Sequence, residues 1–355
     1  MPARIYLDHA ATTPLRPEAA AAIALGVAHW ANPSSPHAEG RKARSLLEDA
    51  RVRIKAALGW NGELIFTSGA SESAAIALSG AKAGFKLVSA VEHESILQAA
   101  RGAEQVSVLA DGALDPDALA DDLEGQYAPL LALQSINSET GNLQDFSQIA
   151  QAVRGAGGLL LVDAAQSAGK LPLPPEADMV VLSAHKLGGP VGIGALLVRD
   201  FAMLEPAGGQ ERGYRRGTEN MPAALGFAAA LDASLQGPYF APGVEQAVER
   251  LAQNVRAIGG VWLSDQLAHP TPFIHAIAMP AMSGSAQLMR FDMLGFAVSQ
   301  GSACSSGSLK QSHVLQAMGI ASEEAARIIR MSAGWNTSVE DIELFAEAWL
   351  AMARE

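Results

Sequence analysis

The chain has 355 residues, 49% hydrophobic and 17% charged, and its formal charge is −12 because 37 Asp and Glu outnumber 25 Lys and Arg. This length and composition are typical of a globular protein with about two domains and a large core. Strong acidity without a Lys/Arg-rich stripe argues against nucleic-acid binding through phosphates. The single cysteine, Cys304, excludes an intrachain disulfide framework and a cysteine-based zinc site, and we expect no metal. No apolar run is long enough to span a membrane, and Asp8 stands where a signal peptide needs its apolar core, so we expect a cytoplasmic protein.

Two helices are expected near the N-terminus. Residues 17–30 carry a helical pattern, and Pro17 suits the first turn of a helix. Residues 39–58 carry a clearer pattern, because their apolar positions recur at 3.6-residue spacing and the charged residues lie on the other face. These apolar positions are Leu46, Leu47, Ala50, Ile54 and Leu58.

The chain then alternates between short apolar runs and helix-compatible stretches. Near-continuous apolar runs of this length are typical of strands covered on both faces, as in a parallel sheet with helices on each side. The alternation therefore predicts an α/β architecture. The expected strands are 63–67, 85–91, 129–136, 158–162, 179–182 and 192–198.

A Gly/Pro cluster at 236–246 marks a hinge, and beyond it the pattern becomes that of a smaller α+β domain. The elements expected there are a helix through residue 257, strands near 260–263 and 273–278, a helix near 323–329 and a final helix over 339–353.

Polar residues directly follow five of the predicted strands. Any one such cluster is readily explained as turn chemistry or a helix cap. Five clusters at the carboxyl ends of strands in one sheet are instead typical of a ligand site. Together they supply a cationic amine, an acid, two imidazoles and a helix start made of small residues. The clusters contain Ser68-Gly69-Ala70-Ser71, Glu92-His93, Asn137-Ser138-Glu139, Asp163 with Gln166, and Ser183 with His185-Lys186.

This inventory fits pyridoxal phosphate. A helix start made of small residues binds a phosphate, a lysine forms a Schiff base with an aldehyde, an aspartate pairs with a protonated pyridine nitrogen, and an imidazole stacks on the ring. Other phosphate sites fit less well. No strand–turn–helix carries G-x-G-x-x-G, the Gly169-Lys170 pair lacks the upstream glycine of a P-loop, and the Gly-rich run 188–194 leads into a strand.

Ten sequence blocks together resemble one family. The sequence closely resembles the cysteine desulfurases, class V members of the fold-type I pyridoxal-phosphate enzymes. The blocks occur in the family's order: YLDHAATTP (6–14), NPSSPH (32–37), FTSGASES (66–73), VEH (91–93), INSETG (136–141), VDAAQS (162–167), SAHKLGGP (183–190), GGQERGYRRGTEN (208–220), GSACSSGS (301–308) and IRMS (329–332).

The resemblance implies a domain organisation. A large domain, 13–245, would bind the cofactor on a mainly parallel seven-stranded sheet flanked by helices. A smaller α+β domain, formed by 1–12 and 246–355, would carry the cysteine.

The resemblance also implies roles for the residues that follow the strands. Lys186 would be the Schiff-base lysine and the catalytic base, which requires a pKa well below the ordinary value of about 10.4. Asp163 would keep the pyridine nitrogen protonated, and Gln166 would reach the phenolic oxygen. Asn137 would touch the same oxygen or the substrate, and His93 would stack on the ring and shuttle protons.

Further residues would bind the phosphate and the substrate. Arg330 matches the residue that grips the substrate carboxylate, which a planar guanidinium can bind through two oxygens. Thr218 matches a phosphate contact supplied by the neighbouring subunit, so the site would be complete only in a homodimer. The phosphate contacts within the same chain would be Ala70, Ser71, Ser183 and His185.

Cys304 decides the reaction that the resemblance implies. A lone cysteine is often a buried small hydrophobe, but the Gly and Ser residues of 301–308 pack poorly into a core. A thiol near its ordinary pKa of about 8.5 is mostly protonated at pH 7, so local activation is expected. Cys304 would take the sulfur of L-cysteine as a persulfide, release L-alanine and pass the sulfur to an acceptor protein for iron–sulfur cluster or thio-cofactor biosynthesis.

Alternatives remain open at this point. Ser138 replaces a common asparagine, and the C-terminal extension with which housekeeping members dock an iron–sulfur scaffold is not found after Glu355, which leaves room for a specialised paralogue. One rival is a selenocysteine lyase or another class V enzyme, which only Cys304 and its surroundings distinguish. The other is a non-catalytic sulfur-transfer scaffold, which would have no need to keep Lys186, Asp163 and His93.

Overall fold

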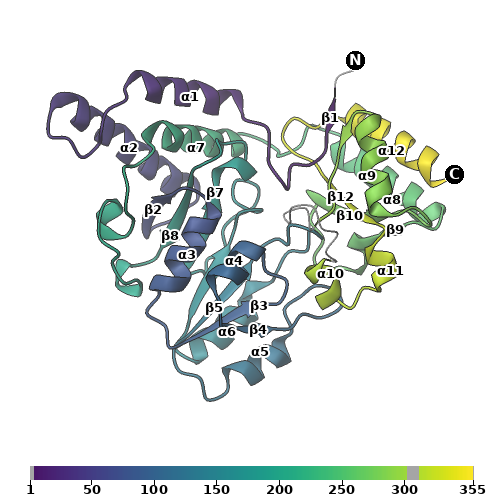
Figure 1. Cartoon of the computed structure of the whole chain (residues 1–355), viewed down its shortest axis with the longest axis horizontal. Coiled ribbons are helices and arrows are strands. Elements are labelled where there is room, and N and C mark those ends of the chain that lie inside the picture. The colour runs from purple at the N-terminus through teal and green to yellow at the C-terminus, as the bar shows by residue number, and fades with distance from the viewer. Residues whose placement is uncertain (1–3, 302–311, 355) are drawn as a thin grey trace.

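A seven-stranded sheet forms the centre of the larger part of the molecule (Figure 1). The computed structural model describes residues 4–301 and 312–354. The strand order is β2-β8-β7-β6-β5-β3-β4, and only β8 runs antiparallel to its neighbours. The strands are β2 (Glu63–Thr67), β3 (Phe85–Ser89), β4 (Glu104–Val106), β5 (Pro129–Gln134), β6 (Leu159–Asp163), β7 (Met179–Ser183) and β8 (Gly194–Val198).

Six of these strands were expected, so the predicted mainly parallel α/β sheet is confirmed. The seventh strand, β4, was not predicted from the sequence because it has only three residues, of which Glu104 and Gln105 are exposed. It is an edge strand, paired only with β3, and edge strands do not need two buried faces.

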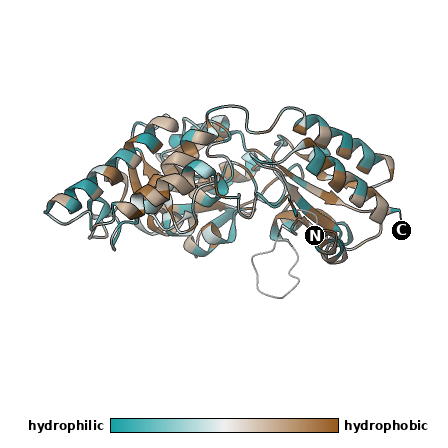
Figure 2. Cartoon of the chain, turned by 90° about the horizontal axis from the view of Figure 1, so that it is seen from above, coloured by the Kyte–Doolittle hydropathy of each residue, from teal (hydrophilic) through white to brown (hydrophobic). Residues whose placement is uncertain are grey.

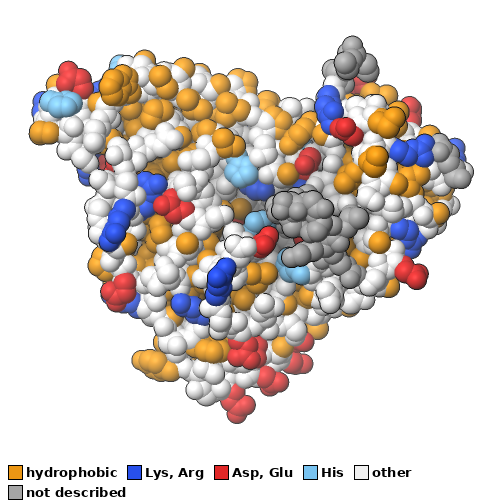
Figure 3. Space-filling view, in the orientation of Figure 1, with side chains coloured by type: hydrophobic (Ala, Val, Ile, Leu, Met, Phe, Trp, Pro, Cys, Tyr) orange, Lys and Arg blue, Asp and Glu red, His pale blue; other side chains and the backbone are white. Residues whose placement is uncertain are grey.

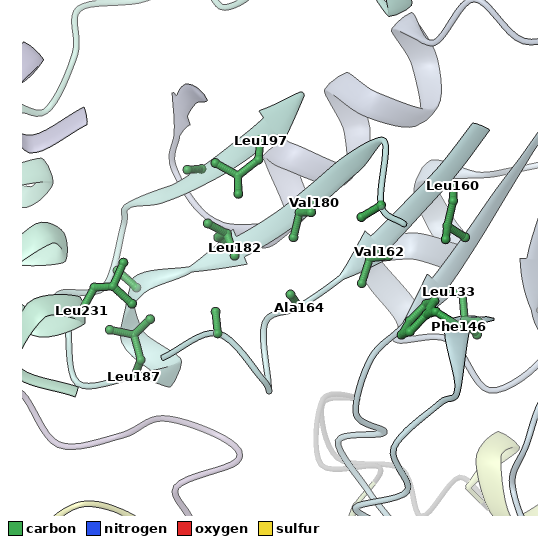
Figure 4. Packing of buried hydrophobic residues seen from close by; sticks show 14 of the residues in the cluster. Leu133, Phe146, Leu160, Val162, Ala164, Val180, Leu182, Leu187, Leu197 and Leu231 are labelled. Atoms are coloured by element: carbon green, nitrogen blue, oxygen red, sulfur yellow. The ribbon is translucent and has the colours of Figure 1, made fainter. Parts of the chain in front are cut away.

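The apolar runs of the central strands are buried on both faces of the sheet. In β5, Leu131 and Leu133 enter one hydrophobic cluster while Leu130 and Ala132 enter the cluster on the opposite face. This alternation is the two-residue period of a strand. Figure 4 shows side chains of one cluster, contributed by neighbouring strands and by helices that cover the sheet.

Helices cover both faces of this sheet, and the strands are more hydrophobic than the helices that flank them (Figure 2). In α2 the expected apolar face is buried, with Leu47, Ala50 and Ile54 almost inaccessible to solvent. Helix α1 packs closely on α7, where a Cβ at Gly26 would lie 2.6 Å from Pro222 Cα. The helices are α1 (Pro17–Ala28), α2 (Ala38–Ala57), α3 (Ala70–Gly80), α4 (Glu94–Ala99), α5 (Pro116–Leu123), α6 (Phe146–Gly155) and α7 (Met221–Ser234), with short 3₁₀ helices η1 (Ala184–Lys186), η2 (Phe201–Met203) and η3 (Glu211–Gly213).

The smaller part of the molecule has its own antiparallel sheet, in the order β12-β10-β9, and its own hydrophobic cluster. The N-terminal strand β1 pairs with β11 in this part, so the chain enters here before it crosses to the large sheet. The strands are β1 (Ile5–Tyr6), β9 (Val261–Trp262), β10 (Ile274–Ala278), β11 (Phe296–Ala297) and β12 (Ile328–Ser332). The helices are α8 (Val244–Ala257), η4 (Leu263–Gln266), α9 (Gly284–Met293), α10 (His313–Ala317), α11 (Ser322–Ala325) and α12 (Val339–Ala353).

The prediction of a helix near 323–329 is wrong. Helix α11 ends at Ala325, and Ile328–Ser332 is a strand whose Ile329 lies opposite Ile277 of β10. A short apolar run is compatible with either structure, and here pairing with β10 decides it. Among the helices of the described residues, none is long and apolar enough to cross a membrane.

Candidate active site

The polar residues that follow the strands meet at one edge of the large sheet, as expected. Strands β3, β5, β6 and β7 are parallel, so their carboxyl ends lie on the same side. Asp163 is the last residue of β6, His93 caps α4 after β3, and Lys186 lies in η1 directly after β7. The three are close enough for the charges of Asp163 and Lys186 to act on the pKa of His93.

The amine of Lys186 is held by the N-terminal segment of the chain. Its Nζ donates to the carbonyl oxygens of Ala10 and Ala11, at 2.5 and 2.9 Å. The amide of Gln166 donates to the same Ala10 oxygen at 2.8 Å. Lys186 and Gln166 are therefore brought together by a segment that lies far from both of them in the sequence. The sequence block at 6–14 was the available signal for this segment, but no role was assigned to it.

Asp163 is a buried carboxylate that can hold a cation. Its side chain accepts a hydrogen bond from the backbone N–H of Ala165 at 2.9 Å, and the residue is 8% exposed. Burial raises the pKa of Asp163, whereas the Ala165 N–H and the charges of His93 and Lys186 lower it. A buried carboxylate is stable only with compensating charge and hydrogen bonds, and a protonated pyridine nitrogen supplies both. The chemistry of this group thus fits pyridoxal phosphate.

The two histidines of the cluster differ in their surroundings. His93 is exposed, and its Nδ1 accepts a hydrogen bond from the Ser95 N–H at 3.2 Å. The pKa of His93 is lowered, chiefly by desolvation. The negative charge of Asp163 raises this pKa, and the positive charge of Lys186 lowers it further. His185 is half-buried, and desolvation followed by the charge of Lys186 lowers its pKa to about 4. Its Nδ1 lies 2.6 Å from Thr12 Oγ1.

The start of α3 is placed beside the end of β7 by a close backbone approach. Gly194 of β8 lies opposite Ser183, and a Cβ at Gly194 would lie 2.7 Å from Gly69 Cα and 2.4 Å from the Leu182 oxygen. A residue with a side chain would push α3 away, so the glycine brings Gly69 next to Ser183. Ala70 and Ser71 form the first turn of α3, whose backbone N–H groups lack intrahelical acceptors. This arrangement is suited to a phosphate.

Thr218, unlike Asp163 and Lys186, does not end or directly follow a strand of the large sheet. It is exposed in the segment between η3 and α7. The same segment is tied to α3 by Arg215, whose Nε lies 3.1 Å from Glu72 Oε1. Its expected contact was with a neighbouring subunit, which a single chain does not contain.

Asn137 uses its side chain to hold a tight turn after β5. Its Oδ1 accepts from the N–H groups of Glu139 and Thr140 at 2.9 and 3.0 Å, and its Nδ2 donates to the Val91 oxygen at 3.1 Å. The turn is thereby fixed next to the β3 end that carries His93.

Arg330 of β12 reaches this turn from the smaller part of the molecule. Its Nη1 donates to the Ser138 oxygen at 2.9 Å and its Nη2 to Asp8 Oδ1 at 2.8 Å. Its Nε is buried without a hydrogen-bond partner among the residues that the structure describes. Because the contact at position 138 is to the backbone, the serine found there in place of asparagine leaves it intact. Within the described residues, Arg330 therefore keeps one buried donor without an acceptor.

Cys304 lies outside the described residues, which end at Gly301 and resume at Ser312. Its predicted role is therefore unchanged by the structure.

Two further ionisable groups at this edge were given no role from the sequence. Glu92 is fully buried, and burial followed by the charge of Asp163 raises its pKa well above the ordinary value. Lys170 lies over the rings of Tyr239 and Phe273, with Nζ 5.5 and 5.6 Å from their centroids. Burial, and then the charge of Lys186, lowers the pKa of Lys170 to about 7. The available signal for Glu92 was its position in the VEH block that contains His93, whereas Lys170 lies three residues beyond the VDAAQS block and had no such signal.

Comparison with known proteins agrees with this geometry. Residues 5–345 match the family model described as Aminotransferase class-V. Cysteine desulfurase IscS 1 of Archaeoglobus fulgidus is 34% identical, over 96% of this chain and 95% of its own length. The chain belongs to the cysteine desulfurase family of class-V aminotransferases. The resemblance predicted from the ten sequence blocks is thus confirmed.

Similar solved structures confirm the fold. A NifS-like protein of Rickettsia africae superposes with a TM-score of 0.88 at 30% identity, over 99% of this chain and all of that one. A structure of SspA in complex with cysteine gives a TM-score of 0.80 at 28% identity, over 94% of this chain and 99% of that one. The fold-type I architecture is therefore confirmed, and pyridoxal phosphate, predicted from the strand-end residues, is the cofactor of the family to which the chain belongs.

Proposed function

We propose that this chain is a cysteine desulfurase that converts L-cysteine to L-alanine and leaves a persulfide on Cys304. The observation that carries the proposal is the meeting of Lys186, Asp163 and His93 at one sheet edge in a chain of this family. Of the similar proteins described above, the one from Archaeoglobus fulgidus is a cysteine desulfurase by name, and the structure of SspA is of a complex with cysteine.

The residues at the sheet edge have distinct roles in this proposal. Pyridoxal phosphate, when bound, supplies an electron sink for the pair left at the substrate Cα. Asp163 keeps the pyridine nitrogen protonated, and Gln166 binds the phenolic oxygen. Lys186 takes the Cα proton at Nζ. The carbonyl oxygens of Ala10 and Ala11 accept hydrogen bonds from Nζ and so orient it without adding charge. His93 covers the ring and relays a proton.

The phosphate and the substrate are bound by separate groups. Arg330 holds the substrate carboxylate, and its unpartnered Nε supports this role. Asn137, whose side chain also holds the turn after β5, would contact the cofactor or the substrate. Phosphate contacts come from Ala70, Ser71, Ser183 and His185, together with Thr218 of a second copy.

Sulfur transfer needs a second nucleophile, which we assign to Cys304. Its thiolate attacks the substrate sulfur, and a sulfur–sulfur bond forms as the carbon–sulfur bond breaks. The electron pair of the broken bond stays on the substrate Cβ, which takes up a proton. Cα regains the proton that Lys186 removed, and the product leaves as L-alanine. The outer sulfur of the persulfide then passes to the thiol of an acceptor protein. A free catalytic thiol is suited to a reducing compartment, in agreement with the predicted cytoplasmic location.

A homodimer would complete the site. Exposed Thr218 supports this proposal, and hydrophobic side chains gather along the upper edge of the molecule over α1 (Figure 3). Contiguous exposed apolar surface is typical of an interaction site. The exposed hydrophobic residues in or next to α1 include Leu15, Leu25, Val27 and Trp30, and Trp30 is 79% exposed.

We also propose that 13–245 forms the cofactor domain and that 1–12 joins 246–355 in the smaller one. Separate sheets support this division. Leu7 and Ala10 pack in the cluster of the smaller part, which supports the assignment of the N-terminal residues.

The proposal is tested by incubating the purified protein with L-cysteine and measuring the mass of the peptide that contains Cys304. One added sulfur and one equivalent of L-alanine are expected. Cys304→Ala should lose both while keeping the visible absorbance of the cofactor, and Lys186→Ala should lose that absorbance. Alanine production that persisted in Cys304→Ala would refute the assigned nucleophile. Parallel reactions with L-selenocysteine separate a desulfurase from a selenocysteine lyase.

A further inference from the structure

A single buried carboxylate contacts both described ends of the chain that flank the 302–311 segment. Glu139 lies in the turn after β5, and Gly301 and Ser312 are the residues that border the segment. We propose that Glu139 is a positioning residue that anchors both ends of the segment carrying Cys304 to the turn beside the cofactor. This inference rests on the proposed function for the role of Cys304.

The contact with the second end is a hydrogen bond. Ser312 Oγ donates to Glu139 Oε2 at 2.6 Å, and both residues are 8% exposed. The same hydroxyl accepts the N–H of Leu315 at 3.1 Å and so caps α10. Hydrogen bonds to a charged acceptor are short and strong, and burial protects them from competing water. The start of α10 is therefore fixed to Glu139.

The contact with the first end is a close packing that only glycine permits. A Cβ at Gly301 would lie 2.5 Å from Glu139 Oε2 and 2.8 Å from Glu139 Cβ and Cδ. Real side chains do not approach this closely, so a larger residue would displace either the backbone or the carboxylate. Because φ of Gly301 is outside the left-handed region, the requirement for glycine here is steric.

Glu139 is itself held in place by the site. Its N–H donates to Asn137 Oδ1 at 2.9 Å, and Arg330 donates to the oxygen of the preceding residue, Ser138, at 2.9 Å. His313, which follows Ser312, lies with Nε2 2.9 Å from the oxygen of Glu92, next to His93. The anchor therefore connects the ends of the segment to the same turn that orients the residues of the site.

This geometry predicts a selective effect on one step. Glu139 fixes the positions of Gly301 and Ser312, the described residues on either side of Cys304 in the sequence, and a misplacement of a reacting group by about 1 Å can cost about 100-fold in rate. Glu139 makes no hydrogen bond described above to Lys186, Asp163 or His93, and its charge is the weakest of the four that act on the pKa of His93. Glu139→Gln removes this charge as Glu139→Ala does, so a difference between the two variants does not come from His93. Loss of its carboxylate should thus slow sulfur transfer and leave cofactor binding and Cα-proton removal unchanged.

The first test compares Glu139→Ala with Glu139→Gln in the full-length holoenzyme. Glu139→Ala should slow single-turnover persulfide formation from L-cysteine by about 10- to 100-fold. Glu139→Gln keeps an acceptor oxygen for Ser312 and should lose far less. Exchange of the Cα proton of L-alanine with deuterium, a reaction that needs no sulfur chemistry, should stay within about twofold of wild type. An unchanged persulfide rate in Glu139→Ala, or an equal loss of deuterium exchange, would overturn the proposal.

The second test uses the close packing. Gly301→Ala should slow persulfide formation and lower the melting temperature in the wild-type background. Both effects should be smaller when Glu139→Gly has removed the clash, because Glu139→Ala would leave a Cβ 2.8 Å away. Purely additive effects of the two substitutions would overturn the anchor. If the wild-type protein formed no persulfide at all, the proposed function would fail, and the coupling in melting temperature would still decide whether Glu139 anchors Gly301.

Discussion

Two buried arginine–carboxylate pairs, one in each part of the molecule, differ in how completely they are satisfied. Arg51 of α2 places Nη1 and Nη2 on the two oxygens of Glu211, at 2.8 and 3.0 Å, and the Glu211 side chain is 1% exposed. Arg330 of β12 reaches Asp8 through Nη2 alone, and the Asp8 side chain is 20% exposed. The two guanidinium groups are equally buried, so the difference lies in their partners.

The pair in the larger part of the molecule leaves little hydrogen-bonding capacity unused. Arg51 Nη1 also donates to the Leu64 oxygen at 2.6 Å, and Glu211 Oε2 also accepts the N–H of Phe66 at 2.7 Å. Glu211 has φ +48°, an unfavourable backbone conformation that surrounding contacts must stabilise. A complete network of this kind holds a loop to a strand.

The Arg330–Asp8 pair leaves part of its hydrogen-bonding capacity unused. The Nε of Arg330 is buried and unpartnered among the described residues, and Asp8 retains contact with water. A substrate carboxylate could therefore bind Arg330 without leaving a buried charge unpaired. Equal burial of two charged groups does not imply an equal role, because the hydrogen-bond donors that lack an acceptor determine which ligand can bind.

Breaking the complete pair should have the largest effect on stability. Arg51→Met leaves Glu211 buried without its cation and should lower the free energy of unfolding by about 3–5 kcal/mol. Urea denaturation measures this loss. Adding Glu211→Gln should restore part of it, since the buried charge is then gone. A loss below about 1 kcal/mol in Arg51→Met would show that the pair is not the structural link inferred here.

A buried histidine outside the cluster tests whether desolvation alone can make a polar group sensitive to pH. His275 of β10 is buried against Trp262, and desolvation lowers its pKa to about 4. The unfolded chain binds its proton at about pH 6.5, so stability is complete above that pH and falls as the pH drops toward 4, by about 3 kcal/mol in total. His275→Gln should flatten the pH dependence of unfolding between pH 6.5 and 4 relative to wild type. Burial also lowers the pKa of His9, to about 3. Parallel curves for the two proteins would contradict the prediction for His275, because His9 and His185 contribute equally to both.

Removing the incomplete pair should affect substrate use more than folding. Arg330→Ala should lower kcat/KM for L-cysteine by about 10- to 100-fold, the value of hydrogen bonds to a charged group. Its stability should fall less than that of Arg51→Met, because Asp8 can become hydrated. Arg330→Lys is the matched control, which keeps the charge but loses the planar fork. Steady-state alanine production and urea denaturation of the same preparations give both readouts, and an unchanged kcat/KM would exclude Arg330 from substrate binding.

The smallest effect is expected from Asp8→Asn. This change keeps a hydrogen-bond acceptor for Arg330 but removes the competing negative charge, so KM for L-cysteine should fall by about two- to fivefold, the value of a partly exposed ion pair. The measurement is a steady-state titration with L-cysteine at low salt. A rise in KM would mean that Asp8 orients Arg330 rather than competing with the substrate.

Much of the fold was predictable because its signals are local. The expected strands at 63–67 and 179–182 match β2 and β7, and the expected final helix matches α12. The errors occurred where pairing overrode the local pattern. Polar β4 is a strand because it adds to the edge of β3, and β12 is a strand because β10 pairs with it.

The candidate site was predictable as a set of residue types but not as a geometry. The contact of Lys186 with Ala10 joins residues 176 positions apart, and that of Glu139 with Ser312 joins residues 173 apart. No local pattern encodes such contacts.

The sequence by itself determined that parallel strands would bring Lys186, Asp163 and His93 to one edge, because strand direction follows from the alternation of apolar runs and helices. Only the tertiary structure decided which of these groups are buried, which donors find partners and how their pKa values move. Burial and hydrogen bonding depend on contacts between distant segments, and each of them changes the free energy of a charge by amounts that the residue type alone does not specify.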